Sequence, residues 1–344
     1  MNIGQPLRVG LAGVGRFGQL HAAVLSQLPE TQLVALADPD PEALAAAADR
    51  HGISRRYADA SGLIADESLD AVVLATPDGQ HPTQVRAALD RGLPVFVEKP
   101  LAGGWQEAAG LQRLADQSGT LLQVGMVLRY ELAHRLLQEQ VHAGAFGDLV
   151  SIRCRRNCSR RSYAAIADQV HTVFRTLIHD IDLLLWLSGS PVQSVTALEV
   201  RQGNHLAPLG CFALLRLASG CVAQLESSWT VPDQAPATVI APQWHSTIDA
   251  ELAVVGTLQT ARLQGLHSGL QIWSDQQLQC PDLSLWPQLQ GEVQGALREQ
   301  LRDFLASVRL GQPSRIASLA DAVEGLRVAE ALIESARLGK TVEL

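Results

Sequence analysis

The first 125 residues alternate short apolar runs with longer segments of mixed polarity. The runs have the length of buried strands, which we expect at Leu7–Ala12, Gln32–Ala37, Ala71–Ala75, Pro94–Val97 and Leu121–Val124. The segments between them are rich in alanine, a strong helix former, and predict helices at Arg16–Leu28, Pro41–His51, Gln80–Arg91 and Gly104–Ser118. This alternation is typical of βαβ units that build a parallel sheet.

The pattern changes after Gly125. Strands separated by Gly, Pro and Ser follow one another without intervening helices, which indicates a mostly antiparallel sheet. We expect its strands at Leu149–Arg156, Ser194–Val200, Cys211–Leu217, Cys221–Ser227, Glu251–Val255 and Leu258–Leu263. Helices are predicted at Glu131–His142, Thr172–Leu187, Glu292–Arg309 and Ser318–Arg337. The segments Cys158–Gln169 and Val231–Ser246 are expected to be loops that carry specificity.

Length and charge limit the classes of function. A chain of 344 residues predicts two domains, here 1–125 and 126–344. The last helix of the second domain could pack back on the first domain. The net charge of -8 disfavours nucleic acid or an anionic membrane as a partner, so a small molecule is expected. With no signal peptide and no apolar run of membrane-spanning length, a cytoplasmic protein is expected. The five cysteines lack paired spacing, which predicts reduced thiols and no zinc site.

A glycine-rich turn follows the first strand and opens the first helix. Its residues are Gly13, Val14, Gly15, Arg16, Phe17 and Gly18. In this context Gly13 permits the tight turn, Gly15 lets the backbone approach a pyrophosphate, and Gly18 allows helix and strand to pack closely. The helix N-terminus supplies amide donors for the phosphates. The pattern predicts a dinucleotide site; the alternative is a turn that only packs.

An acidic residue stands at the end of the second strand, twenty residues after Gly18. The carboxylate of Asp38 would accept hydrogen bonds from the ribose hydroxyls and repel a 2'-phosphate, and Asp40 adds further negative charge. We therefore expect NAD as the cofactor in preference to NADP. The alternative for Asp38 is a turn or helix-capping role before Pro39.

A lysine closes the strand Pro94–Val97, in the tripeptide Glu98-Lys99-Pro100. In an open α/β sheet, ligands bind beyond the carboxyl ends of the strands. A lysine there, partly desolvated and close to a positive nicotinamide, can exchange its proton near neutral pH. Lys99 is therefore the first candidate for proton transfer.

These motifs, taken in order, resemble the Gfo/Idh/MocA family of NAD(P)-dependent oxidoreductases over nearly the whole chain. The resemblance rests on the glycine turn, Ala75-Thr76-Pro77 with His81, Glu98-Lys99-Pro100, Ile178-His179-Asp180-Ile181-Asp182 with Trp186, Val254-Val255-Gly256-Thr257, and the C-terminal helix ending at Lys340. It implies an α/β fold: an N-terminal Rossmann domain followed by an α+β domain on an open, mostly antiparallel sheet. It also implies a homodimer or homotetramer formed through that sheet.

The resemblance further implies roles for individual residues. Lys99 matches the active-site lysine and His179 the histidine of the second-domain helix. Glu98, the Thr76-Pro77 segment and His81 are implied to lie near the cofactor, together with Arg16 and Phe17 of the glycine turn.

The helix that carries His179 has a readable pattern of its own. Arg175, His179, Asp182 and Trp186 are spaced by four, three and four residues, so they share one face of an α-helix. Asp182 could orient the imidazole and leave its other nitrogen for substrate. The alternative is a half-buried histidine that Asp182 satisfies.

The chain departs from the family pattern near this helix. Sugar and inositol dehydrogenases of the family commonly carry two glycines and then an aspartate four residues before the histidine. Here the aspartate position is Arg175, and the glycine positions are Val170 and His171. Either the substrate is anionic and Arg175 grips it, or another acid such as Asp168 substitutes, or oxidation is lost.

Two further sets of residues are candidates for lining the substrate cleft. Arg153, Arg155, Arg156, Arg160 and Arg161 form a basic cluster, which either supports an anionic substrate or is a solvated strand edge. Gln123 and Arg129 follow the last Rossmann strand and could line the cleft, although Arg129 and Tyr130 have packing as their alternative role.

The sequence thus predicts an NAD-dependent oxidoreductase that acts on a secondary alcohol of a sugar, polyol, inositol or sugar acid. The expected substrate-binding set is Arg175, Asp182, Arg129 and His171, and the expected cofactor-binding set includes Gln123 and Lys99. Two alternatives come from other classes: a glycosidase that retains NAD and oxidises its sugar transiently, and a non-catalytic NAD-binding sensor.

Overall fold

The computed structural model describes residues 5–241, 244–265, 269–273, 275 and 278–344. The chain divides into two compact units. Unit 1 contains the residues up to Tyr130 together with Gln288–Val323, and unit 2 contains Glu131–Pro287 together with Glu324–Leu344. The sequence suggested two consecutive segments. The difference arises because α9 (Ala296–Leu310) buries Leu297, Leu301 and Phe304 within unit 1.

Unit 1 is built on a parallel sheet of order β3-β2-β1-β4-β5-β6. The strands are β1 (Leu7–Ala12), β2 (Thr31–Ala37), β3 (Arg55–Tyr57), β4 (Ala71–Leu74), β5 (Val95–Glu98) and β6 (Leu122–Gly125). All neighbouring pairs run parallel, and this order is that of the doubly wound dinucleotide-binding fold. The central strands are buried on both faces, as their continuous apolar runs predict.

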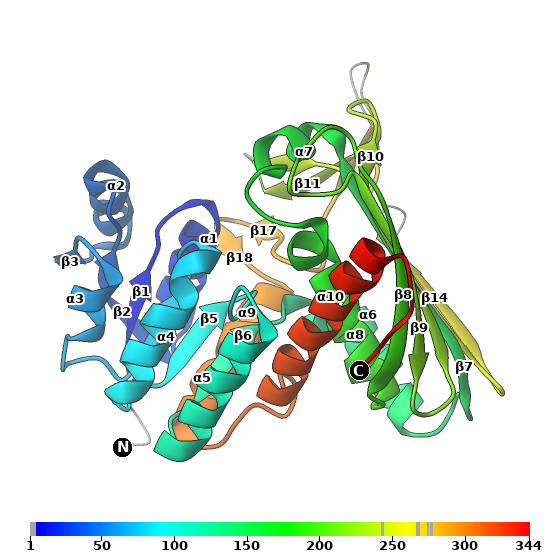
Figure 1. Cartoon of the computed structure of the whole chain (residues 1–344). Helices are drawn as coiled ribbons and strands as arrows, with labels where there is room; N and C mark the ends of the chain where they lie inside the picture. Colours follow the sequence, from blue (N-terminus) through cyan, green and yellow to red (C-terminus); the bar gives the residue numbers. More distant parts are fainter. Residues whose placement is uncertain (1–4, 242–243, 266–268, 274, 276–277) are drawn as a thin grey trace. The chain divides into compact units, whose positions relative to one another are not determined.

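Helices cover both faces of this sheet. One layer contains α3 (Ala60–Ile64), α4 (His81–Asp90) and α5 (Trp105–Ser118), and α4 and α5 lie side by side in Figure 1. The other contains α1 (Arg16–Gln27), α2 (Pro41–His51) and α9. A short 3-10 turn, η1 (Asp78–Gln80), precedes α4, and η2 (Val127–Tyr130) follows β6. β3 and α3 were not expected from the sequence, because they are only three and five residues long and too short to show a periodic pattern.

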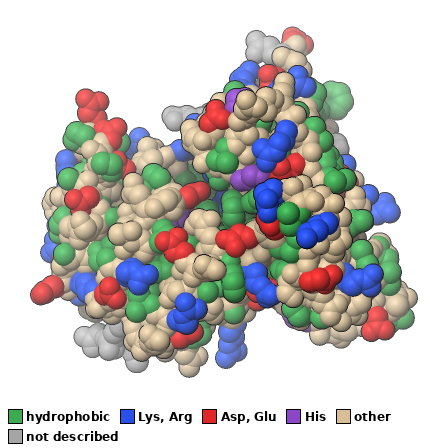
Figure 2. Space-filling view, in the orientation of Figure 1, with side chains coloured by type: hydrophobic (Ala, Val, Ile, Leu, Met, Phe, Trp, Pro, Cys, Tyr) green, Lys and Arg blue, Asp and Glu red, His purple; other side chains and the backbone are tan. Residues whose placement is uncertain are grey.

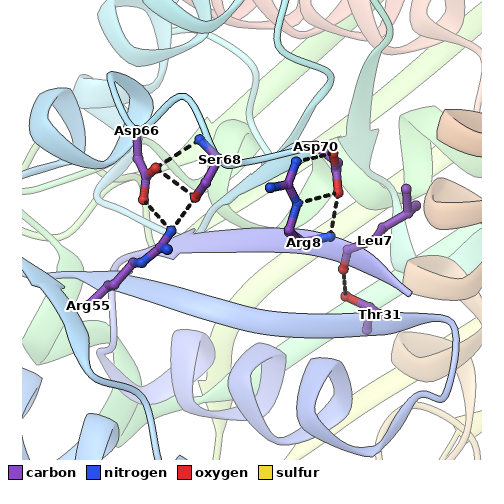
Figure 3. Close-up of polar contacts among 7 residues, drawn as sticks. All are labelled: Leu7, Arg8, Thr31, Arg55, Asp66, Ser68 and Asp70. Carbon is purple, nitrogen blue, oxygen red and sulfur yellow. Dashed lines mark hydrogen bonds and ion pairs between the residues drawn. The ribbon is translucent and has the colours of Figure 1, made fainter. Parts of the chain in front are cut away.

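Polar contacts tie the strands together at their amino-terminal ends, opposite the glycine turn (Figure 3). Arg8 of β1 donates to both carboxylate oxygens of Asp70, at 3.2 and 2.9 Å, and these bonds lower the pKa of Asp70. Thr31 donates to the carbonyl of Leu7 at 3.1 Å. These contacts fix where β1 begins relative to β2 and β4.

Unit 2 contains a mixed sheet of order β14-β13-β7-β10-β9-β8-β19. Its strands are β7 (Leu149–Ser159), β8 (Val192–Val200), β9 (Gly210–Leu217), β10 (Val222–Val231), β13 (Ile248–Gly256), β14 (Thr260–Gln264) and β19 (Val342–Glu343). The β7–β10 pair is parallel and the others are antiparallel. The predicted α/β fold class, with a mostly antiparallel second sheet, is confirmed.

The helices of unit 2 are α6 (Leu132–His142), α7 (Arg160–Ile166), α8 (Ile178–Ser188) and the second part of α10 (Leu319–Leu338). Two short sheets remain. One has the order β12-β11-β16-β15 and contains β11 (Ala237–Ala241), β12 (Trp244–Ser246), β15 (Ile272–Trp273) and β16 (Leu278–Pro281). The other is the hairpin of β17 (Gln288–Leu289) and β18 (Glu292–Val293). The expected loops at 158–169 and 231–246 therefore contain α7, β11 and β12.

Two helix predictions needed correction. The helix expected at Glu292–Arg309 begins only at Ala296, because Glu292 and Val293 form β18 and Gly295 has a φ of 79°. The helix expected at Thr172–Leu187 opens with a π-helical turn, η3 (Val173–Leu177), and becomes α-helical at Ile178. Periodicity alone could not distinguish the two forms.

Candidate active site

The glycine turn of unit 1 has the geometry that each glycine was expected to supply. Gly13 has a φ of +87°, and a Cβ there would lie 2.4 Å from the carbonyl oxygen of Ala75. A Cβ on Gly18 would lie 1.9 Å from the carbonyl oxygen of Gly13. A Cβ on Gly15 would meet nothing within 4 Å. Gly13 and Gly18 are therefore required by packing, whereas Gly15 leaves open space.

That open space lies at the N-terminus of α1. Gly15 is the N-cap residue, and the helix has neither a side-chain cap nor an acidic residue in its first turn. A helix N-terminus without an acidic residue favours a bound anion, which fits a dinucleotide pyrophosphate. Arg16 is exposed beside this end, and the half-buried ring of Phe17 makes an edge contact with His21.

Asp38 follows β2 at the same end of the sheet. One carboxylate oxygen accepts a hydrogen bond from Val14 N at 2.8 Å, and the other accepts from Asp40 N at 2.9 Å. The side chain therefore also has the turn role that the sequence left open, and it holds the glycine loop against the end of β2. Asp40 caps α2 by accepting from Glu42 N and Ala43 N. A carboxylate has enough lone pairs to accept a ribose hydroxyl as well.

The residues after β4 form a second wall at the carboxyl end of the sheet. Thr76 donates from its hydroxyl to Gln84 at 2.6 Å, and Pro77 precedes η1. The ring of His81 is fully buried and lies between two carbonyl oxygens, those of Pro100 at 2.7 Å and Thr76 at 2.9 Å. His81 thus ties the turn after β4 to the turn after β5.

Glu98 ends β5 and is followed by Lys99, which is half-buried. The peptide bond between Lys99 and Pro100 is cis. The carboxylate of Glu98 lies 2.8 Å from Nε2 of His21 and accepts from Lys99 N at 3.3 Å. A Cβ on Gly125 would lie 3.0 Å from this carboxylate, so glycine there leaves room for it. His21 was not among the residues expected at the site. Its position on the buried face of α1, three residues after Gly18, was the available signal.

A second signal for the role of Lys99 is the small number of lysines in the whole chain. The chain has 27 basic residues, of which only Lys99 and Lys340 are lysines. Arginine stays protonated in proteins, whereas a lysine amine can give up its proton. In a chain that uses arginine almost everywhere, a lysine at this strand end favours proton transfer over simple charge.

Gln123 and Arg129 lie deep inside unit 1, each 1% exposed. Gln123 donates to the hydroxyl of Tyr130, which donates to Asp303 at 2.6 Å. Arg129 donates to the carbonyl of Ile316 and pairs with Asp321, both at 2.9 Å. These contacts join β6 and η2 to α9, to the segment after it and to the start of α10, and they support the packing role for Arg129 and Tyr130.

In unit 2, η3 and α8 carry the other candidate residues. Arg175 is exposed in the π turn, His179 is half-buried at the start of α8, and Asp182 is buried. Because the π turn interrupts the α-helical period, Arg175 does not share a continuous α-helical face with the later residues, and that expectation needs correction. Single π turns occur frequently at functional sites.

The neighbours of this segment are held by polar contacts within unit 2. His171 accepts from Val173 N through Nδ1, and its Nε2 lies 3.0 Å from Glu199. Asp168, the suggested substitute acid, lies 2.9 Å from Nδ1 of His205. Asp180, next to His179, accepts two hydrogen bonds from the buried Arg156. Burial alone would lower the pKa of Arg156, but the Asp180 carboxylate raises it above its ordinary value.

The strand-edge interpretation of the arginine cluster is wrong for the arginines of β7. That strand lies between β13 and β10, so it is not an edge. Arg153 pairs with Glu251, and Arg155 lies 3.0 Å from Asp249, both across the β7–β13 pair. Arg153 and Arg155 therefore form cross-strand ion pairs on the sheet, which a single sequence could not reveal because the acidic partners lie almost a hundred residues away.

The parallel sheet, the open glycine turn and the acidic residue after β2 define unit 1 as a dinucleotide-binding Rossmann domain. Residues 7–126 match the Gfo/Idh/MocA description "oxidoreductase family, NAD-binding Rossmann fold", and residues 134–262 match the C-terminal domain of the same family. The chain belongs to the Gfo/Idh/MocA family and is an NAD-dependent oxidoreductase. The predicted family, enzyme class and cofactor are confirmed.

Individual relatives agree with this assignment. An inositol 2-dehydrogenase of Leifsonia xyli is 32% identical over 281 residues, which span 78% of this chain and 76% of the relative. A 4-carboxy-2-hydroxymuconate-6-semialdehyde dehydrogenase of a Sphingobium strain is 27% identical over 55% of this chain and 61% of its own length. The crystal structure of myo-inositol 2-dehydrogenase from Lactobacillus plantarum has a TM-score of 0.82 at 23% identity, covering 98% of this chain and 99% of that one, and shows the shared fold.

Proposed function

We propose that this oxidoreductase oxidises a secondary alcohol of a polyol, inositol, sugar or sugar acid, with Lys99 as the general acid and base. The observation that carries the proposal is the position of Lys99: it directly follows β5, at the carboxyl ends of the strands where the glycine turn and Asp38 also lie. The similarity to an inositol 2-dehydrogenase supports a polyhydroxylated substrate.

Bound NAD supplies the acceptor for the hydride that leaves the substrate carbon. The residues of this chain manage the proton. The neutral amine of Lys99 would accept the hydroxyl proton as the carbonyl forms, and the ammonium would return it in the reverse direction. His179 would hydrogen-bond the reacting oxygen.

We propose further that the substrate carries an acidic group, which the guanidinium of Arg175 binds. Arg175 is exposed on the π turn four residues before His179. Arginine forms bidentate bonds with carboxylates and phosphates. The relative that acts on a carboxylated semialdehyde supports an acidic substrate within the family. Arg175→Ala should raise the KM of an acidic substrate by at least about tenfold and leave the KM for NAD unchanged.

The decisive experiment is a screen of inositols, polyols, sugars and sugar acids for NADH absorbance at 340 nm, with Lys99→Ala in parallel. Lys99→Ala should retain NAD binding and lose about 10²-fold or more of kcat. Full activity in this variant would overturn the role of Lys99. Substrate conversion without net NADH would instead indicate the glycosidase, and no conversion with intact NAD binding would indicate the sensor.

We also propose that the uncovered face of the unit 2 sheet forms a homodimer or homotetramer. Leu198 and Phe212 are paired neighbours on β8 and β9, and they are 68% and 39% exposed, with Leu214 beside them at 57%. Exposed apolar side chains that lie together are typical of protein interfaces. Leu214→Glu should reduce the mass measured by light scattering to that of a monomer; an unchanged mass would place the interface elsewhere.

A macromolecular partner such as nucleic acid is not part of the proposal. On the face shown in Figure 2, basic and acidic side chains are interspersed, with no large basic patch. Among the residues that the structure describes, no helix combines the length and apolar character needed to cross a membrane. All five cysteines are free and buried, which fits the reduced thiols expected for action in the cytoplasm.

A further inference from the structure

Two buried histidines hold the residues on either side of Lys99. Nε2 of His21 lies 2.8 Å from the carboxylate of Glu98, which precedes the lysine. Nδ1 of His81 lies 2.7 Å from the carbonyl oxygen of Pro100, which follows it. Both imidazole rings are 0% exposed. The short turn that presents Lys99 is therefore fixed at both ends by side chains that solvent does not reach.

His21 contacts Glu98 from the dinucleotide-binding helix α1. Its ring makes edge contacts with Phe17, at 5.2 Å between centroids, and with Phe96, at 5.6 Å. Among the residues that the structure describes, Nδ1 of His21 has no hydrogen-bond partner. A neutral ring with its proton on Nε2 therefore donates to Glu98 and leaves only a lone pair unsatisfied, which costs less than an unpaired buried N–H of an imidazolium.

The other carboxylate oxygen of Glu98 accepts from Lys99 N at 3.3 Å, and the missing Cβ of Gly125 leaves room for the carboxylate. Glu98 thus links the buried imidazole of His21 to the backbone of the lysine itself. A displacement of His21 would move Glu98 and, through it, the start of the Lys99 side chain.

His81 acts on the other side of the turn. A carbonyl oxygen can only accept a hydrogen bond. A ring nitrogen of His81 that carries a proton therefore donates a hydrogen bond to the carbonyl that it faces. The two carbonyls belong to Pro100, beside Lys99, and to Thr76, after the neighbouring strand. The ring is buried at the first turn of α4, a rigid element of unit 1. His81 therefore fixes the far end of the lysine turn relative to the sheet.

We propose that His21 and His81 are positioning residues for Lys99, a role that rests on the proposed function of Lys99 in proton transfer. Neither ring needs to touch substrate or cofactor in this role. Displacement of a reacting group by about 1 Å can cost on the order of 10²-fold in rate, so loss of either contact should lower kcat far more than it weakens NAD binding.

The contacts of His81 allow a matched pair of variants. An asparagine amide can replace Nδ1 of a histidine, and a glutamine amide can replace Nε2. His81→Asn can therefore keep the contact to Pro100 and lose the one to Thr76, whereas His81→Gln does the reverse. Because only Pro100 adjoins Lys99, His81→Gln should lose about tenfold more kcat than His81→Asn. For His21, Leu removes the donor and Gln can restore it, so His21→Gln should recover most of the kcat lost in His21→Leu.

The composition of the chain provides a direct reporter of the lysine. With lysine labelled at 13Cε, the folded enzyme with NAD should give two signals, from Lys99 and from the exposed Lys340, which serves as the internal reference. In His21→Leu the Glu98 carboxylate loses its donor, so its negative charge is less compensated and the titration midpoint of the neighbouring Lys99 should rise by about half a unit or more. That of Lys340 should not move. His51→Leu, on α2, removes a histidine outside this turn and should match the wild type.

The outcomes separate this inference from the proposed function. If Lys99→Ala is inactive but His21→Leu and His81→Gln, folded and binding NAD, keep wild-type kcat and an unshifted Lys99 signal, the positioning role is wrong and the role of Lys99 stands. Equal losses in His81→Asn and His81→Gln would also overturn it for His81, because a general packing role predicts that equality. If Lys99→Ala remains active, the proposed function fails whatever the signals show.

Discussion

The guanidinium of Arg156 donates two hydrogen bonds, each 2.9 Å long, to the carboxylate of Asp180 inside unit 2. Arg156 lies on the central strand β7 and Asp180 on α8, one residue after His179. The pair is almost entirely buried, with side chains 13% and 3% exposed. The pair therefore fixes α8, the helix that carries His179, to the sheet of unit 2.

Removing one partner of this pair should destabilise unit 2 strongly. Asp180→Asn leaves a buried guanidinium without its counter-charge, and such losses cost about 3–5 kcal/mol. The free energy of unfolding can be measured in urea. Arg337→Gln removes half of an exposed pair with Glu334, 2.6 Å apart, and should change stability by less than ~1 kcal/mol. Equal effects of the two substitutions would contradict the structural role of Arg156 and Asp180.

The three glycines of the nucleotide turn should respond differently to alanine. Gly15 has a φ of -63°, and its Cβ would enter open space. Gly15→Ala should therefore fold normally and bind NAD about tenfold or more weaker, because the methyl group occupies the path of the pyrophosphate. Gly18→Ala should instead lower the free energy of unfolding by more than ~2 kcal/mol, since its Cβ meets a carbonyl. Calorimetric NAD titration and urea unfolding separate the two; normal NAD affinity in Gly15→Ala would argue against this binding geometry.

Asp38 should determine the choice of cofactor. Asp38→Ser removes the negative charge that repels a 2'-phosphate, so the ratio of kcat/KM for NAD over that for NADP should fall by about tenfold or more. Glu42→Gln changes a nearby exposed carboxylate in the first turn of α2 and should leave the ratio unchanged. A wild-type enzyme that prefers NADP would reverse this interpretation of Asp38.

The stability of unit 1 should depend on pH through Asp66. Burial raises the pKa of this carboxyl, but hydrogen bonds from Ser68 and Tyr57 and the charge of Arg55 outweigh it and lower the pKa from 3.8 to about 2. A depressed pKa contributes stability above the unfolded value, and this contribution is lost as pH falls from about 4 to 2. Asp66→Asn should therefore cost roughly 1 kcal/mol at pH 7 and nothing near pH 2. Asp116 is exposed on α5. In Asp116→Asn, the stability measured by thermal melts should differ from that of the wild type by the same small amount at both pH values.

The sequence predicted the parts of the fold that depend on local pattern. The bounds of β1 and α2 agree with the expected ones, because a buried apolar run and a proline-started, alanine-rich helix before Gly52 are signals within a few residues. The glycine turn and Asp38 were found because their spacing is itself the motif. Local signals of this kind suffice for a Rossmann domain.

The missed features depend on residues that are distant in sequence. The partner of Glu98 is His21, 77 residues earlier, and the partners of the β7 arginines lie on β13. Nothing in the local pattern around Arg153 indicates an interior strand, because its exposed charges resemble those of an edge strand until the acidic residues of β13 are placed beside them. The π turn at Arg175 is likewise invisible in a periodicity of four and three.

The chain passes from one unit to the other after Tyr130, after Pro287 and after Val323, the last time within the continuous helix α10. Neither unit is therefore one uninterrupted stretch of the gene. Exchanging unit 2 for that of a relative would require several matched recombination points, one of them inside a helix. Point substitutions avoid this requirement, because they leave all three connections between the units intact.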